Sequence, residues 1–184
     1  FSPSEASSAG LHDPYDRQLE ERTVGRIQAR VTELKAQLQH DSDVLSRIDA
    51  AIALAKKGGL EAVKALIVAL TDDPFWGIRV EVAGQLATVK LDQAFEGLVK
   101  GLADPDARVR RAVVAAIAKL KTTASYQALK PIAEKGDASY LVEASALSGI
   151  GSILGSSETD VGEAIQLFQE VLAQRAGWNE TVRS

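Results

Sequence analysis

The segment D-S-D-V-L-S-R-I-D-A-A, residues 41–51, decides the fold because similar segments follow it at regular intervals. The first is D-P-F-W-G-I-R-V-E-V-A at residues 73–83, and the second is D-P-D-A-R-V-R-R-A-V-V at residues 104–114. Successive arginines are 32 and then 31 residues apart, at Arg47, Arg79 and Arg110. A fixed period of this length indicates stacked supersecondary units, so the sequence predicts an elongated repeat protein.

Two further segments follow the same pattern less closely. G-D-A-S-Y-L-V-E-A-S-A, residues 136–146, has Gly136 in place of the aspartate and Val142 in place of the arginine. The fragment W-N-E-T-V-R places Arg183 at the arginine position, 41 residues after Val142. An insertion of about nine residues relative to the period therefore precedes a fifth repeat.

A second set of apolar residues lies between these segments, with spacing i, i+3, i+7. This spacing places three side chains on one face of an α-helix. The residues after each arginine also follow a helical pattern, so each repeat is expected to be a pair of short helices that must stack to bury their apolar faces. The triplets are Val31, Leu34, Leu38; Val63, Leu66, Leu70; Phe95, Leu98, Leu102; Tyr126, Leu129, Ala133; and Ile165, Phe168, Leu172.

The composition favours an all-α fold. The chain is 46% hydrophobic but only 5% aromatic, and no alternating β-branched run is bounded by a hairpin turn. We predict a right-handed α-α superhelix, a solenoid of about five helix pairs with the last truncated. A flexible leader is expected at residues 1–16 and a repeat domain at 17–184, with repeats at approximately 17–56, 57–89, 90–121, 122–154 and, incomplete, 158–184.

The two ends suggest a part of a longer polypeptide. The chain contains no methionine, and residues 1–14 are rich in serine and proline without the apolar run of a signal peptide. The fifth repeat stops inside its second helix, whereas a terminal repeat normally caps the stack with a polar face. We expect the natural polypeptide to continue past Ser184 and to begin before Phe1.

Composition also excludes several kinds of site. No cysteine occurs, which excludes disulfides and thiolate metal ligands, and the only histidines are His12 and His40. Zinc-binding, phosphate-binding and serine-hydrolase motifs are absent, so no catalytic or metal residue and no cofactor are assigned to this chain. The net charge of −4 disfavours nucleic acid, and no segment is long and apolar enough for a membrane span. We expect a cytoplasmic protein.

The repeated motif predicts a structural ladder of charges. An aspartate in the turn precedes an arginine in the next helix by six residues, in the pairs Asp41 and Arg47, Asp73 and Arg79, and Asp104 and Arg110. We expect each arginine to bridge aspartates of its own and the adjacent unit, so that Arg110 would contact Asp104 and the preceding Asp73. The ladder should break at Gly136 and Val142.

Two tryptophans in the turns have two possible roles. Trp76 and Trp178 each precede a second helix. The first interpretation is that Phe75 and Trp76 fill the wedge between neighbouring repeats. The alternative is that an aromatic residue at the rim anchors a partner, as in interface hot spots.

The V-R motif after the turn, with Pro131 in the middle of a first helix, resembles HEAT-type repeats, although the period is shorter than their usual ~40–47 residues. The chain from about residue 36 also resembles the C-terminal helical-repeat region of bacterial aminopeptidase N-type zinc metallopeptidases, the gluzincins. The segments that carry this resemblance are residues 36–51, 72–83 (D-D-P-F-W-G-I-R-V-E-V-A), 106–114, 136–144 and 177–183.

The resemblance implies a non-catalytic domain of a zinc aminopeptidase. The zinc would lie in an upstream catalytic domain, and none of its motifs is present here. These helices would cover the active site and restrict entry to peptides, or bind peptides or partners. The alternatives are a freestanding adaptor that binds a protein or peptide, and a HEAT-like bilin lyase, which would be an enzyme. The partner is therefore expected to be the upstream domain or another protein or peptide, with no nucleic acid and no membrane.

Overall fold

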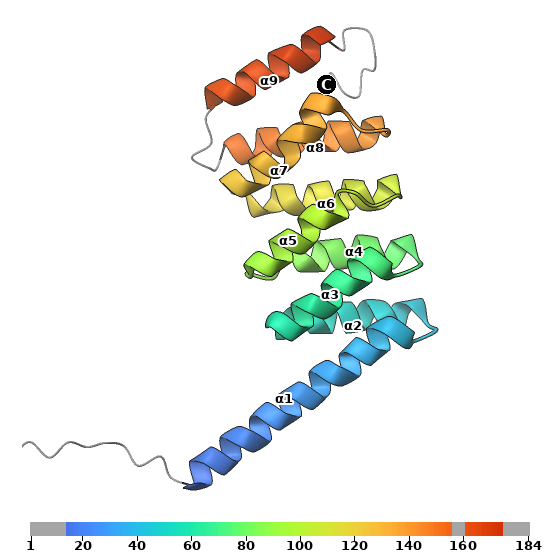
Figure 1. Cartoon of the computed structure of the whole chain (residues 1–184), viewed down its shortest axis with the longest axis vertical. Coiled ribbons are helices and arrows are strands. Elements are labelled where there is room, and N and C mark those ends of the chain that lie inside the picture. The colour runs from blue at the N-terminus through green and yellow to red at the C-terminus, as the bar shows by residue number, and fades with distance from the viewer. Residues whose placement is uncertain (1–13, 156–160, 175–184) are drawn as a thin grey trace, which may run out of the picture.

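The computed structural model describes residues 14–155 and 161–174, which form nine α-helices and no β-strand. The predicted all-α solenoid is confirmed: successive helices form antiparallel hairpins that stack along one axis (Figure 1). The helices are α1 (Pro14–His40), α2 (Val44–Lys57), α3 (Leu60–Asp72), α4 (Trp76–Leu86), α5 (Asp92–Gly101), α6 (Ala107–Leu120), α7 (Thr123–Lys135), α8 (Tyr140–Leu154) and α9 (Val161–Gln174).

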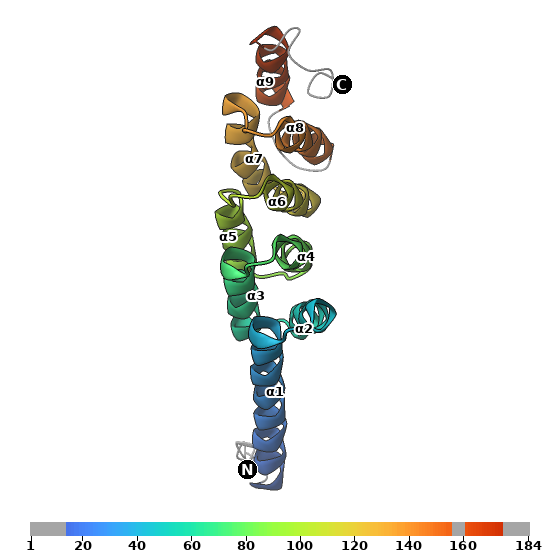
Figure 2. The same cartoon turned by 90° about the vertical axis from the view of Figure 1, so that its right-hand side faces the viewer.

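The stack has two layers. Figure 2 shows α1, α3, α5, α7 and α9 in one layer and α2, α4, α6 and α8 in the other. The buried apolar residues lie mainly between these layers and form one continuous core from α1 to α9. Each helix therefore buries its apolar face against the helices of the next hairpin as well as its own partner.

Each first-layer helix in the middle of the stack buries two adjacent apolar stripes. In α3 the predicted stripe Val63, Leu66 and Leu70 is fully buried. A second stripe of small residues, one position earlier, is also at most 5% exposed and consists of Ala62, Ala65 and Ala69. Small residues allow close approach in α5 too, where a Cβ on Gly97 would lie 2.5 Å from Ile67 Cγ1. The alanine and glycine content thus sets the spacing between repeats.

Only the last part of α1 belongs to the core. Val31, Leu34 and Leu38 are buried as predicted, whereas residues 17–30 are all exposed. The helix projects beyond the stack in both views (Figures 1 and 2). It begins at Pro14, inside the expected leader, and residues 1–13 lie outside the described part of the chain.

The last helix differs from the expectation. Its predicted stripe is largely uncovered: Ile165 is 50% exposed, Leu172 is 46% exposed and Phe168 is only partly buried. The residues one position earlier are buried instead, namely Ala164, Leu167 and Val171. The reason is that α9 packs on α7 and α8 through this earlier stripe, and the described residues contain no second-layer helix after α9 that would cover the other one.

Candidate functional site: the ladder and the groove

Four aspartates hold the turns between paired helices in the same way. In each, Oδ1 accepts a hydrogen bond from the backbone N–H two residues later, a turn that aspartate is well suited to form. The four residues, with their oxygen–nitrogen distances, are Asp41 (2.9 Å), Asp73 (2.9 Å), Asp104 (2.8 Å) and Asp137 (2.7 Å). Asp137 is therefore the equivalent aspartate of the fourth repeat.

The arginines join each repeat to the next one. Arg79 donates from Nε and Nη2 to the two carboxylate oxygens of Asp104, at 2.7 and 3.0 Å. Arg110 makes the same bidentate contact with the carboxylate of Asp137, at 2.8 and 2.7 Å. Within its own repeat each of these arginines donates to backbone carbonyls and not to the carboxylate. Arg79 binds Asp73 O at 2.8 Å, and Arg110 binds Asp104 O at 2.9 Å and Pro105 O at 3.2 Å.

The first rung of this ladder is weaker. Arg47 reaches Asp73 Oδ2 through Nη1 alone, at 2.6 Å. Its Nε is buried and has no hydrogen-bond partner in the described part of the chain. Asp41 forms no salt bridge there either, because the arginine that would reach it would have to come from a preceding repeat.

Two predictions about the ladder are wrong. Arg110 contacts the following aspartate and not the preceding Asp73, so the ladder runs forward along the chain. The fourth aspartate is Asp137 and not Gly136, because Gly136, with φ of 84°, adds one residue between the end of α7 and the aspartate. Counting six residues from Asp137 places Glu143, not Val142, at the arginine position, where it is fully buried.

The charges of the ladder stabilise one another. The hydrogen bond to Asp104 raises the pKa of Arg79 above its ordinary value, and the bond to Asp137 does the same for the pKa of Arg110. Burial opposes ionisation of Asp137, but hydrogen bonds from Arg110 and the Ser139 N–H outweigh it and lower its pKa. Such charge-assisted, paired groups are suited to holding repeats together rather than to chemistry.

Trp76 also joins neighbouring repeats. The guanidinium carbon of Arg108 lies 3.7 Å from the centre of its ring, a cation–π contact between the second and third repeats. Arg108 also binds the carboxylate of Asp106, whose pKa falls to about 2. Arg108 therefore contacts two neighbouring side chains although its own side chain is 58% exposed. Phe75 remains 38% exposed beside Trp76, and Trp178 lies outside the described residues.

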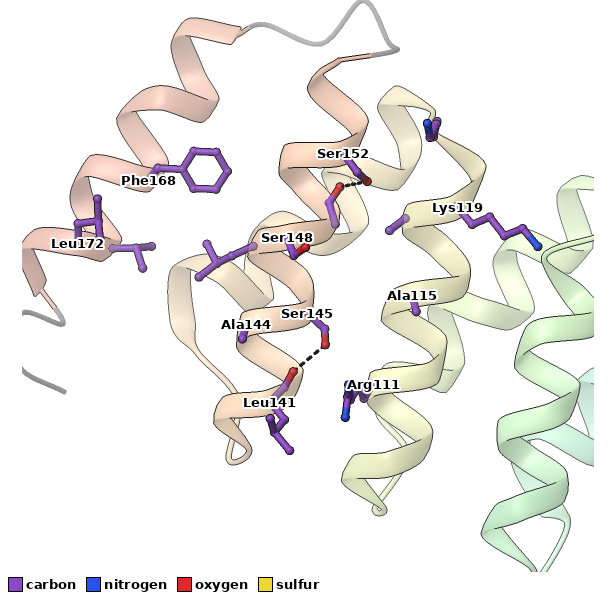
Figure 3. Close-up of a pocket in the computed structure, with 15 residues that line it drawn as sticks. Arg111, Ala115, Lys119, Leu141, Ala144, Ser145, Ser148, Ser152, Phe168 and Leu172 are labelled. Atoms are coloured by element: carbon purple, nitrogen blue, oxygen red, sulfur yellow. Dashed lines mark hydrogen bonds between the residues drawn. The ribbon is translucent and has the colours of Figure 1, made fainter. Parts of the chain in front are cut away.

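A groove of about 820 Å³ lies where α6, α8 and α9 meet (Figure 3). It is open to solvent, and its floor is made mainly of small side chains, with larger apolar groups from α8 and α9 at its sides. Its lining residues are Arg111, Ala115, Ala118, Lys119, Lys121, Leu141, Ala144, Ser145, Leu147, Ser148, Gly149, Ser152, Phe168, Val171 and Leu172.

The groove is cationic. Arg111, Lys119 and Lys121 form no salt bridge with any residue that the structure describes, and the lining contains no carboxylate. Helix α6 contains no acidic residue at all. The hydroxyls of Ser145 and Ser152 are held by backbone carbonyls of their own helix, at 2.8 and 2.7 Å. The groove therefore combines apolar surface with positive charge that the described residues do not neutralise.

Sequence reasoning did not find this groove. Its residues come from three helices and share no motif, although the absence of acidic residues from 107–120 was a signal. Within residues 14–155 and 161–174, no group of three histidines, cysteines or carboxylates could hold a metal ion. His40 lies exposed at the end of α1, and His12 lies outside the described residues.

Comparison with known proteins identifies the repeats. Residues 63–150 match the family of HEAT repeats. The helical-repeat part of the chain is therefore HEAT-like, as the V-R motif and Pro131 suggested. None of the helices in the described part of the chain has the length and hydrophobicity needed to span a bilayer. No curated protein sequence gives a significant match.

Two solved structures are similar to this HEAT-like chain. Human deoxyhypusine hydroxylase, in complex with glycerol, shares 26% identity with a TM-score of 0.60, over 68% of this chain and 44% of the hydroxylase chain. The CpcE–CpcF complex of phycocyanin lyase from Nostoc sp. PCC7120 contains a chain with 26% identity and a TM-score of 0.52, over 83% of this chain and 60% of that one. The chain thus spans less than two thirds of either protein, and neither match is an aminopeptidase.

Proposed function

We propose that this HEAT-like chain is a non-catalytic module that binds a protein partner through the groove between α6, α8 and α9. The observation that carries the proposal is the contrast in charge. The buried arginines of the ladder are paired with aspartates, whereas the three cations of the groove have no partner among the described residues. Positive charge beside apolar surface is a common arrangement for recognition of a protein.

The stacked architecture supports this function. A solenoid presents an extended surface from a rigid scaffold. The last rung of the ladder, from Arg110 to Asp137, joins α6 to the turn before α8, two of the three helices that form the groove. The similar CpcE–CpcF structure is itself a complex of two chains, which is consistent with association through this kind of fold. The zinc aminopeptidase resemblance would specify an upstream catalytic domain as the partner, but no comparison supports that narrower choice.

Site-specific photo-crosslinking in the natural host would test the proposal. A photoreactive amino acid replaces Ser148, which is exposed in the groove, and in a matched variant it replaces Thr71, which is exposed on α3. A discrete crosslinked protein is expected from position 148 and not from position 71. Equal crosslinking from both positions, or none from position 148, would contradict the proposal.

A second candidate is a subunit of a bilin lyase. The similarity to the phycocyanin lyase complex favours it, because it covers 83% of this chain. The chain would then help to attach a bilin to an acceptor protein. Incubation of the chain with a free bilin and an apo-phycobiliprotein tests this function, and bilin retained on the acceptor after denaturation is the expected result. An acceptor that stays colourless would exclude the reaction for this chain acting by itself.

A further inference from the structure

We infer that the groove binds an acidic amphipathic α-helix of the partner protein, with its apolar face inward and carboxylates along its edges. The inference rests on the proposed function and specifies the chemistry of the bound segment. Three features of the groove support it: its dimensions, its uncovered apolar stripe and its charge.

The dimensions suit a helix. Along α8 the lining extends from Leu141 to Ser152, a length of about 16 Å at 1.5 Å per residue, which corresponds to three turns of a bound helix. The floor consists of small residues such as Ala115, Ala144 and Ser148. Small side chains on one helix allow the axis of another to approach closely, because the larger side chains of the incoming helix occupy the space.

The uncovered stripe on α9 supplies the apolar contact. Phe168 and Leu172 line the groove and occupy the register that is buried in α3 by Leu66 and Leu70. In α3 that register is covered by helices of the second layer, including α4. On α9 no described helix covers it, so Phe168 and Leu172 give the groove an apolar side that a bound helix can contact. Leu141 on α8 adds apolar surface at the far end of the groove.

The charge favours acidic side chains on the bound helix. Arg111 and Lys119 lie two turns apart on α6, and Lys121 follows just after its end. Two carboxylates at this end of the stack bind other cations: Asp137 binds Arg110, and Glu163 binds Lys130. A helix with glutamates beside its apolar stripe would supply the missing counter-charges at the rim, which increases specificity and the rate of association.

Binding of two designed peptides would test the inference with the full-length chain. Both are 15-residue helical peptides with leucines at i, i+3 and i+7; one has glutamates at the flanking positions and the other has lysines. Fluorescence anisotropy should show that the glutamate peptide binds at least about tenfold more tightly, with an affinity that falls as salt rises. Equal affinity for both peptides, or no binding of either, would overturn the inference.

Charge reversal in the groove is the second part of this peptide-binding test. In Arg111→Glu/Lys119→Glu the preference should shift towards the lysine peptide, whereas Lys56→Glu/Lys57→Glu on α2 should retain the wild-type preference. Circular dichroism checks that both variants stay folded. An unchanged preference in the groove variant would refute the assignment of the site.

The crosslinker at position 148 distinguishes this inference from the proposed function. Crosslinks to a separate protein, without binding of the glutamate peptide, would preserve the function and reject the acidic helix. A crosslink only within the chain, to residues 175–184, would show that the chain covers its own groove and would overturn both.

Discussion

The middle of the stack and its C-terminal end both contain apolar stripes and charged residues, but the two regions differ in how these are covered and paired. In α3 to α6 both apolar stripes are covered, and Arg79 and Arg110 each bind an aspartate of the next repeat with two hydrogen bonds. At α8 and α9 one stripe is open, the arginine position holds Glu143 and three cations face a groove. An apolar face or a charge is buried in the stack where its counterpart is present, and it stays open to solvent where it is not.

The largest expected difference between the two regions is in local stability. Backbone amides of α3 to α6 should exchange through nearly global unfolding, whereas those of α9 should exchange through local opening, because one of its stripes is uncovered. We expect the opening free energies to differ by on the order of 4 kcal/mol. Hydrogen exchange measured by mass spectrometry would show this difference, and uniform protection from α3 to α9 would contradict it.

Removing a rung should have the next largest effect. Arg110→Ala leaves the largely buried carboxylate of Asp137 without its partner, so it should lower the free energy of unfolding by about 3 kcal/mol. Arg111→Ala removes the same charge from the adjacent, exposed position and should change stability by no more than about 0.5 kcal/mol. Urea unfolding of both variants makes the comparison, and similar losses would show that the ladder does not stabilise the stack.

A glycine pair in α8 tests how closely the repeats approach. A Cβ on Gly149 would lie 2.9 Å from Ala118 Cβ in α6, so Gly149→Ala should destabilise the protein by about 2 kcal/mol through overpacking. Gly151 has open space around it in the same helix, and Gly151→Ala should stabilise by about 0.5 kcal/mol. Thermal melts of the two variants should therefore shift in opposite directions. Shifts of the same sign would contradict the close packing of α6 and α8.

The smallest expected effect is a change in acid sensitivity. The pKa of Asp137 is lower in the folded protein than in the unfolded chain, where an aspartate has a pKa of about 3.9. Its contribution to stability is present above the unfolded value and is lost as the pH falls through the folded value. Asp137→Asn should lose less stability than the wild type between pH 5 and pH 3, as urea midpoints would show. Parallel pH profiles would mean that this carboxylate does not contribute.

Much of the fold could be predicted because helical spacing determines which side chains face the core. Val63, Leu66 and Leu70 are buried for that reason, and the period alone indicates that their helices stack. The direction of the ladder could not be predicted. The spacing of Asp104 and Arg110 along the chain does not determine whether the long arginine side chain reaches the preceding or the following repeat. The single added residue Gly136 moved the apparent register and concealed Asp137.

The groove was beyond sequence analysis for a different reason. Arg111, Ser148 and Phe168 become neighbours only when three helices pack, and each of these residues is ordinary for its own helix. The stripe Ile165, Phe168 and Leu172 was correctly read as apolar. Its exposure depends on whether another helix covers α9, which the spacing of residues within α9 does not reveal.

The forward direction of the ladder also determines how such a chain could change in length. A duplicated copy of residues 73–103, which is 31 residues long, would bring both an aspartate for the preceding arginine and an arginine for the following aspartate. Whole repeats could thus be gained or lost by duplication or deletion while every rung stays paired. After the fourth repeat the rule no longer applies, because the arginine position holds Glu143, which has no guanidinium to bind an incoming aspartate. Growth by simple duplication is therefore confined to the part of the solenoid before α8.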